Sequence, residues 1–184
     1  MKSAFPGFDS PAVGFEQPFE MLLACHERVR RSLSLLGRLV SRVGERGHDD
    51  ATRSAASDVL RYFDLAAPLH HEDEETHVFP VLAASADAEL VAAASGLHAD
   101  HLRMTALWSA IRPTLEAWSA AHASGTGEAD FLDRVADFER IYEAHLATEE
   151  RLVFPAARER ISASLMAAMS SDMARRRGAP AGPP

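Results

Sequence analysis

Cysteine is almost absent from this 184-residue chain, which excludes an internal disulfide framework. The single cysteine, Cys25, fits a protein of a reducing compartment. No apolar run approaches the roughly 20 residues that a membrane-spanning helix needs. Residues 5–9 (FPGFD) interrupt any charged-then-apolar leader at the start of the sequence. From these absences we expect a soluble, cytoplasmic protein that does not act at a membrane.

Aromatic and β-branched residues are sparse, and positive charge is in deficit. Aromatics make up 7% of the chain, whereas Ala, Leu, Arg and Glu dominate, a composition that favours helices over strands. The balance of 19 Lys and Arg against 27 Asp and Glu gives a net charge of −8. This excludes a general nucleic-acid or anionic-membrane surface. The length suits a single all-α domain with a sizeable core.

The sequence repeats its metal-binding residue types with an offset of 75 residues and no gap. Each half has a lone histidine, His26 or His101, followed about 44 residues later by H-x-x-x-E-E-x-x-V-F-P. The longer motif occupies residues 70–80 in the first half and residues 145–155 in the second. A doubled pattern of this kind is typical of a pseudo-twofold bundle that pools ligands from both halves into one site.

Hydrophobic periodicity and capping residues predict four main helices and a short fifth one. Pro68 predicts a kink or a short break just before the motif histidines. We expect an extended N-terminal arm over residues 1–17, an antiparallel four-helix bundle over 18–158, an extra C-terminal helix over 159–176 and a disordered tail over 177–184.

The motif spacing places donor groups on one helix face. Residues four apart lie about one turn apart, so His70 pairs with Glu74 and His145 with Glu149. In an antiparallel bundle both pairs can face the axis, where the two lone histidines join them. A single H-x-x-x-E is more often a surface ion pair. Burying the doubled set without metal, however, would leave polar groups unpaired at a cost of several kcal/mol. Four imidazoles and two carboxylates suit two metal ions, with each carboxylate spanning both.

Imidazole and carboxylate donors suit iron, manganese or zinc, and spacing alone does not choose between them. The E-x-x-H ligand pattern of ferritin-like di-iron proteins is absent, as is the H-E-x-x-H of zinc proteases. Glu75 and Glu150 directly follow the candidate carboxylates. They either accept hydrogen bonds from ligand imidazoles or lie on a solvated helix face. We expect Tyr62 and Tyr142 to serve as bundle packing and Cys25 as a small buried residue.

The order His…HxxxE…His…HxxxE, with E-E-x-x-V-F-P in each half, resembles the hemerythrin-like (HHE cation-binding) domain family over roughly residues 19–157. The resemblance implies an up-down-up-down four-helix bundle that holds two iron ions (Fe²⁺/Fe³⁺) bridged by carboxylates and by an oxo or hydroxo group. It implies Glu74 and Glu149 as the bridging carboxylates. The six ligands that it implies are His26, His70, Glu74, His101, His145 and Glu149.

Oxygen-carrying members of this family use a fifth histidine, four residues from another on the third helix. This sequence departs from that pattern, because the nearest upstream histidine, His98, precedes His101 by three residues. His98 and His71 are both candidates for a seventh ligand, and the shared helix face slightly favours His98. Their counterparts in the other half are Leu23 and Leu146. We therefore expect the two metal positions to be unequal.

The leading hypothesis is a di-iron protein that binds dioxygen or a related small oxidant. A second hypothesis is an interaction module that senses iron or oxygen, motivated by the N-terminal arm and the extra helix. A third is an enzyme that turns over peroxide or nitric oxide at the same centre. The sequence has no Gly-rich cofactor loop and no nucleophile triad, so we rank the enzyme below small-ligand binding and expect no dedicated catalytic residue.

Overall fold

The computed structural model describes residues 14–120, 123–125, 127 and 129–179, and within these residues the chain is helical and has no strand. The all-α prediction is therefore confirmed. In chain order the elements are α1 (Pro18–Arg46), α2 (Asp50–Arg61), the π-helical turn η1 (Tyr62–Ala66), α3 (Ala67–His77), α4 (Phe79–Ala83), α5 (Ala88–Ser119), α6 (Ala129–Thr148), the π-helical turn η2 (Glu149–Val153), α7 (Phe154–Arg160) and α8 (Ala163–Arg176).

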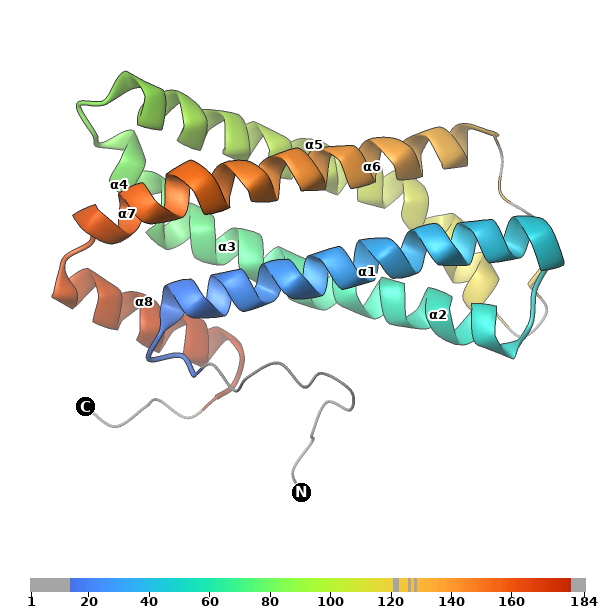
Figure 1. Ribbon diagram of the computed structural model, residues 1–184. Helices are drawn as coiled ribbons and strands as arrows, with labels where there is room; N and C mark the ends of the chain where they lie inside the picture. Colours follow the sequence, from blue (N-terminus) through green and yellow to red (C-terminus); the bar gives the residue numbers. More distant parts are fainter. Residues whose placement is uncertain (1–13, 121–122, 126, 128, 180–184) are drawn as a thin grey trace.

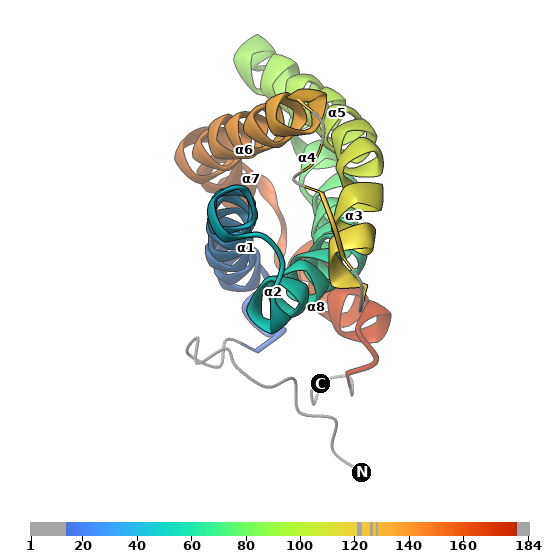
Figure 2. The ribbon, with the colours of Figure 1, turned by 90° about the vertical axis from the view of Figure 1, so that its right-hand side faces the viewer.

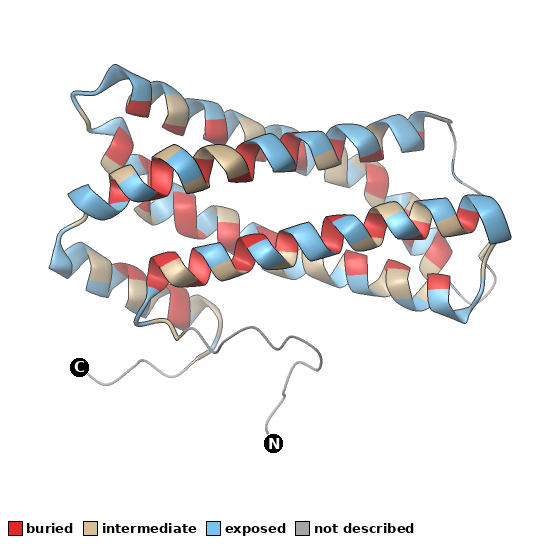
Figure 3. Ribbon diagram, viewed as in Figure 1, coloured by how far each residue is buried: buried red, intermediate tan, exposed pale blue. Residues whose placement is uncertain are grey.

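The helices form a bundle (Figure 1). Helix α1 packs against α2 and α6, and α5 packs against the same two helices, so the four enclose a common interior (Figure 2). Buried residues line the inward faces of these helices, and exposed residues line their outward faces (Figure 3). None of the described helices is both long enough and apolar enough to cross a lipid bilayer.

Two apolar clusters fill the interior, and the two longest helices, α1 and α5, contribute to both. On α1 the first cluster includes Phe19 and Leu22, and the second begins at Val29. His26 lies between them on the same buried face. The other candidate ligands interrupt the apolar face of their own segments in the same way. The sequence therefore buries a polar layer between two hydrophobic ones.

Capping side chains fix the starts of α2 and α5. Asp49 accepts a hydrogen bond from the Thr52 backbone N–H at 2.8 Å, and the Thr52 hydroxyl oxygen accepts one in return from the Asp49 N–H at 2.8 Å. This reciprocal pair satisfies two backbone donors that the helix leaves free. Asp87 accepts from the Glu89 N–H at 2.9 Å and caps α5 in the same position. These caps set the first turn of α5, which carries His101, and of α2, which continues through η1 into α3.

A proline is the second residue after each π-helical turn. At η1 the Ala67 N–H, directly before Pro68, donates a hydrogen bond to the Tyr62 carbonyl five residues earlier. At η2 the Phe154 N–H, directly before Pro155, donates a hydrogen bond to the Glu149 carbonyl in the same way. Proline lacks an N–H and its ring crowds the carbonyl four residues earlier, so a wider turn relieves the clash. The break or kink expected before the histidines is thus a widened turn in a continuous helix.

Helix α8 closes one end of the bundle against α1 and α3. Met169 and Met173 are fully buried, and the Ser162 hydroxyl accepts a hydrogen bond from a backbone N–H to cap the helix. The tail expected to be disordered from residue 177 begins with an anchored residue, because Arg177 pairs with the buried carboxylate of Asp73 at 2.6 Å. Residues 180–184 and residues 1–13 of the expected arm lie outside the described residues.

Candidate metal centre

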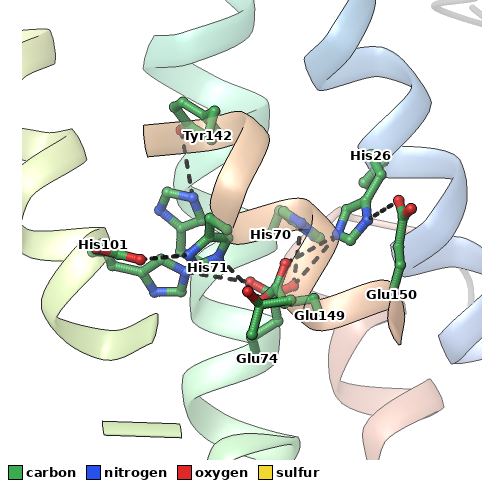
Figure 4. A network of polar contacts seen from close by, with 12 residues as sticks. His26, His70, His71, Glu74, His101, Tyr142, Glu149 and Glu150 are labelled. Carbon is green, nitrogen blue, oxygen red and sulfur yellow. Dashed lines mark hydrogen bonds and ion pairs between the residues drawn. The ribbon is translucent and has the colours of Figure 1, made fainter. Parts of the chain in front are cut away.

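The six candidate ligands lie together in the polar layer. His26 comes from α1, and His101 comes from α5. The motif pairs come from α3 and from the junction of α6 with η2 (Figure 4). None of the six exposes more than 2% of its surface: His26, His70, Glu74, His101, His145 and Glu149. The structure therefore brings together the whole set that the repeat predicted.

These donors form two groups, and both groups contain Glu74 and Glu149. In each group the four donor atoms lie within 4.8 Å of one another. In the first group, Nε2 of His26 lies 3.2 Å from Oε2 of Glu149. Nε2 of His70 lies 3.2 Å from Oε1 of Glu74. One cation among these atoms would have two imidazoles and one oxygen from each carboxylate.

The second group uses the other oxygen of each carboxylate. Nε2 of His145 lies 3.1 Å from Oε1 of Glu149, and Nε2 of His101 lies 3.5 Å from Oε2 of Glu74. The two Nε2 atoms are 3.1 Å apart. Each glutamate therefore turns one oxygen toward each group, which is the arrangement of a carboxylate that spans two cations.

Unsatisfied polar atoms show that this pocket fits metal ions. Among the buried side-chain atoms described, several in the pocket have no hydrogen-bond partner: both carboxylate oxygens of Glu74 and of Glu149, Nε2 of His26, and both ring nitrogens of His70. Each such group costs about 1–3 kcal/mol when left unpaired in a protein interior. In this buried space the lone pairs of nitrogen and oxygen atoms face one another, and a bound cation would satisfy them. Imidazole and carboxylate donors together suit first-row metals.

Burial controls the protonation of the pocket. Burial first, and then the neighbouring Glu149, raise the pKa of Glu74 well above its ordinary value. Burial alone would also raise the pKa of Glu149, but the nearby His145 and His26 outweigh it and lower that pKa well below the ordinary value. Burial, with His145 as the next cause, lowers the pKa of His101 to about 3. A neutral imidazole is the form that binds a metal ion.

Carboxylates from the opposite half orient the two lone histidines. Nδ1 of His26 lies 2.8 Å from Oε1 of Glu150, and Nδ1 of His101 lies 2.7 Å from Oε1 of Glu75. A protonated Nδ1 donates to the carboxylate, which leaves the Nε2 lone pair directed at the pocket. The sequence left open whether these glutamates serve the ligands or face solvent, and the structure shows the first arrangement.

One further acidic residue escaped the sequence argument. Oδ2 of Asp100 lies 3.7 Å from Nδ1 of His145. Its position in the first half is occupied by Cys25, so the repeat carries no signal for it. Nδ1 of His145 and Nδ1 of His70 are both buried without a hydrogen-bond partner, and of the two only His145 has an acidic side chain beside that nitrogen among the described ion pairs. The two groups therefore differ in how many of their imidazoles face an acidic partner.

Neither candidate for a seventh ligand belongs to the two groups. The His98 side chain is 54% exposed, and its Nδ1 lies 3.5 Å from Oε1 of Glu75. Residues three apart on a helix are offset by about 60°, which carries His98 out of the pocket. His71 instead stacks on the ring of His101, with centroids 3.8 Å apart and planes 12° apart. The structure thus does not bring His98, the favoured candidate, to the metal-binding atoms.

Comparison with known proteins agrees with this geometry. Residues 17–157 match the family described as the hemerythrin HHE cation binding domain. The chain is also similar to an uncharacterized protein of Haemophilus influenzae, with 32% identity over 163 residues that cover 89% of this chain and 91% of the relative. Helix α8 lies beyond the matched family segment. The resemblance found in the repeat is confirmed: the chain belongs to the hemerythrin HHE cation-binding family.

Proposed function

We propose that this protein is a non-haem di-iron protein that binds dioxygen or a related small oxidant in the bundle core. One observation carries the proposal: two groups of buried donors share Glu74 and Glu149, and each carboxylate gives one oxygen to each group. The ligands proposed are His26, His70, Glu74, His101, His145 and Glu149. We also infer the up-down-up-down arrangement of the family, which is supported by the ring of contacts that links α1, α2, α5 and α6.

The chain's own residues prepare the pocket for this role. Glu74 and Glu149 hold two cations near each other, and Glu75 and Glu150 direct imidazole lone pairs inward. The two apolar clusters on either side exclude bulk water from the layer. When bound, iron would supply electrons to a small oxidant, which the side chains alone do not.

Iron is favoured over zinc and manganese by the family and by the four imidazoles. The decisive experiment measures metal content by elemental analysis and records absorption before and after the reduced protein meets air. We expect two irons per chain and ferric charge-transfer bands after exposure. Zinc as the bound metal, or iron without such bands, would overturn the proposal.

A matched pair of variants on neighbouring turns sharpens this experiment. Glu149→Gln removes one shared carboxylate, and we expect it to lose the second metal ion and the bands. Glu143→Gln makes the same chemical change at an exposed position of α6 and should leave both unchanged. Equal metal content in the two variants would count against bridging by Glu149.

A second candidate function is metal-dependent sensing through α8. The observation that favours it is the ion pair of Arg177 with Asp73, the residue directly before Glu74. A shift of α3 on metal binding would move the partner of this arginine. Limited proteolysis of the C-terminal segment, with and without metal, tests the idea. Identical cleavage rates would reject it.

A further inference from the structure

Three side chains that can move an electron or a proton have no part in the proposed ligand set. They are His71, Tyr142 and Trp108. His71 stacks on His101, and its Nε2 lies 3.4 Å from the hydroxyl oxygen of Tyr142 (Figure 4). Tyr142 is buried, and His71 is the hydrogen-bond partner that the structure gives its hydroxyl. A phenol that faces a ring nitrogen has a base to take its proton.

Aromatic contacts continue from Tyr142 to the protein surface. Its ring centroid lies 4.9 Å from that of Phe138 and 5.7 Å from that of Phe63. Both phenylalanines contact Trp108, with centroid distances of 5.9 Å and 5.1 Å respectively. Trp108 is partly exposed, and its indole N–H donates to the carboxylate of Asp64 at 2.9 Å. Rings in contact thus connect the pocket to the solvent.

The 75-residue repeat shows which of these rings have an aromatic counterpart in the other half of the sequence and which do not. Phe63 and Phe138 are repeat partners, as expected of a shared core. The partners of His71, Tyr142 and Trp108 are instead aliphatic, and all three are buried: Leu146, Ala67 and Leu33. Aliphatic side chains suffice for packing at the equivalent positions. Packing alone therefore does not explain why this side of the bundle has a histidine, a tyrosine and a tryptophan.

We propose that Tyr142 and Trp108, with His71 as the acceptor of the phenolic proton, form a one-electron relay that carries oxidising equivalents from the metal pocket to the surface, where a small thiol restores the electron. The inference deepens the proposed function, on which it rests. Electron tunnelling weakens steeply with distance, so contacting rings favour this route over transfer through aliphatic packing. The relay would protect the ligand imidazoles when a peroxide arrives at a centre that lacks the electrons to reduce it.

Electrons and protons balance along the relay. Tyr142 gives one electron toward the pocket and its phenolic proton to Nε2 of His71, so an O–H bond breaks, an N–H bond forms and a neutral phenoxyl radical remains. Trp108 then reduces the phenoxyl radical by one electron, and His71 returns the proton to the phenolate oxygen. A small thiol in solution then reduces the indole radical cation at the surface. Two passages reduce one hydrogen peroxide, with two protons, to two waters, while two thiols become a disulfide and release two protons.

The other tyrosine provides a matched control. Tyr62 also contacts Phe63, with ring centroids 5.2 Å apart, but its hydroxyl donates to the Cys25 backbone carbonyl at 3.3 Å. A carbonyl does not accept a transferred proton as an imidazole does. Tyr62→Phe and Tyr142→Phe therefore remove the same hydroxyl from the same aromatic cluster, and only the second breaks the relay.

The first test adds hydrogen peroxide to the iron-loaded protein, freezes it rapidly and records electron paramagnetic resonance spectra. We expect a tyrosyl signal that disappears in Tyr142→Phe, persists in Tyr62→Phe and grows in Trp108→Phe, in which the radical has no onward donor. Peptide mapping should find oxidised Trp108 in the parent and oxidised ligand histidines in Tyr142→Phe. Equal radical yields in the parent and in Tyr142→Phe would overturn the relay.

A second test separates the relay from the proposed function, because it needs no metal. The full-length protein as purified is photo-oxidised by a ruthenium polypyridyl complex with persulfate, which attacks accessible Trp108. Transient absorption should show an indole radical that decays as a tyrosyl radical rises, because the contacts that carry an electron from Trp108 to Tyr142 also carry one in the reverse direction when Trp108 is oxidised first. The rise should be lost in Tyr142→Phe and slowed in His71→Leu, which carries the aliphatic residue of the repeat partner. Indole decay that is identical in all three proteins would reject the relay, whatever the metal content.

Discussion

Oε1 of Glu75 lies 2.7 Å from Nδ1 of His101, so an acid in the first half of the chain orients a candidate ligand in the second half. Glu150 and His26 repeat the contact in the opposite direction at 2.8 Å. In these two histidines Nε2 faces the pocket because Nδ1 of the same ring is hydrogen-bonded to a carboxylate.

These orienting contacts predict a loss of metal affinity on mutation. Glu75→Ala and Glu150→Ala should each weaken metal binding by about 10- to 100-fold, the usual effect of removing a carboxylate behind a ligand imidazole. Competition with a chromophoric chelator measures the change. Glu143→Ala, an exposed glutamate of α6, is the control. Unchanged affinity in both variants would show that these contacts do not support a metal site.

Metal binding should stabilise the fold strongly. A metal that binds only the folded chain adds about 4 kcal/mol to the free energy of unfolding when its free concentration is a thousandfold above the dissociation constant. It also relieves the unpaired polar atoms of the pocket. Thermal melting with and without iron should therefore differ by many degrees. The difference should vanish in His145→Ala, and a parent protein that melts equally in both conditions would contradict the prediction.

The candidate ligands could be predicted because their arrangement is local. His70 and Glu74 share a face through helix geometry alone, and the repeat adds the second pair. The orientation of Glu75 toward His101 depends on how α3 packs against α5, which no periodicity encodes. Asp100 lacks a repeat partner of its type and was missed. His98 met the spacing rule but projects to solvent, because a small angular offset decides between pocket and surface.

The pairing of Asp73 with the C-terminal arginines predicts a large stability effect. Asp73 is fully buried, and it pairs with Arg176 at 2.5 Å and with Arg177 at 2.6 Å. Replacing both arginines by alanine leaves a buried carboxylate without its partners, which costs about 3–5 kcal/mol. Urea unfolding of the double variant measures this.

Replacing all three members of this cluster separates the two contributions. If Asp73→Ala is added to the double arginine variant, part of the stability should return because no buried charge remains. Arg175→Ala is the control, because its side chain is exposed and pairs with Asp172 rather than with Asp73. A double variant as stable as the parent would show that the ion pairs do not hold α8.

The cap of α2 predicts a pH dependence in the acid range. The hydrogen bond from Arg42, and then that from the Thr52 backbone, lower the pKa of Asp49 from 3.8 to about 2. Because the folded pKa lies below the unfolded one, Asp49 contributes stability that is fully present above pH 3.8 and is lost as the pH falls through about 2. The difference in urea midpoint between the parent and Asp49→Ala should narrow across this window.

The crossed supply of donors bears on how such a chain could arise. In each group one half of the sequence gives three donors, and the other half gives the fourth donor and the acid that orients a lone histidine. A half-length chain would therefore lack a complete set, and two copies related by a twofold axis would restore it. The arrangement of the site is that expected of a homodimer whose two subunits were joined into one polypeptide. After fusion, each position could change independently of its repeat partner. One side of the bundle could then acquire His71 and Tyr142 while the equivalent positions keep Leu146 and Ala67.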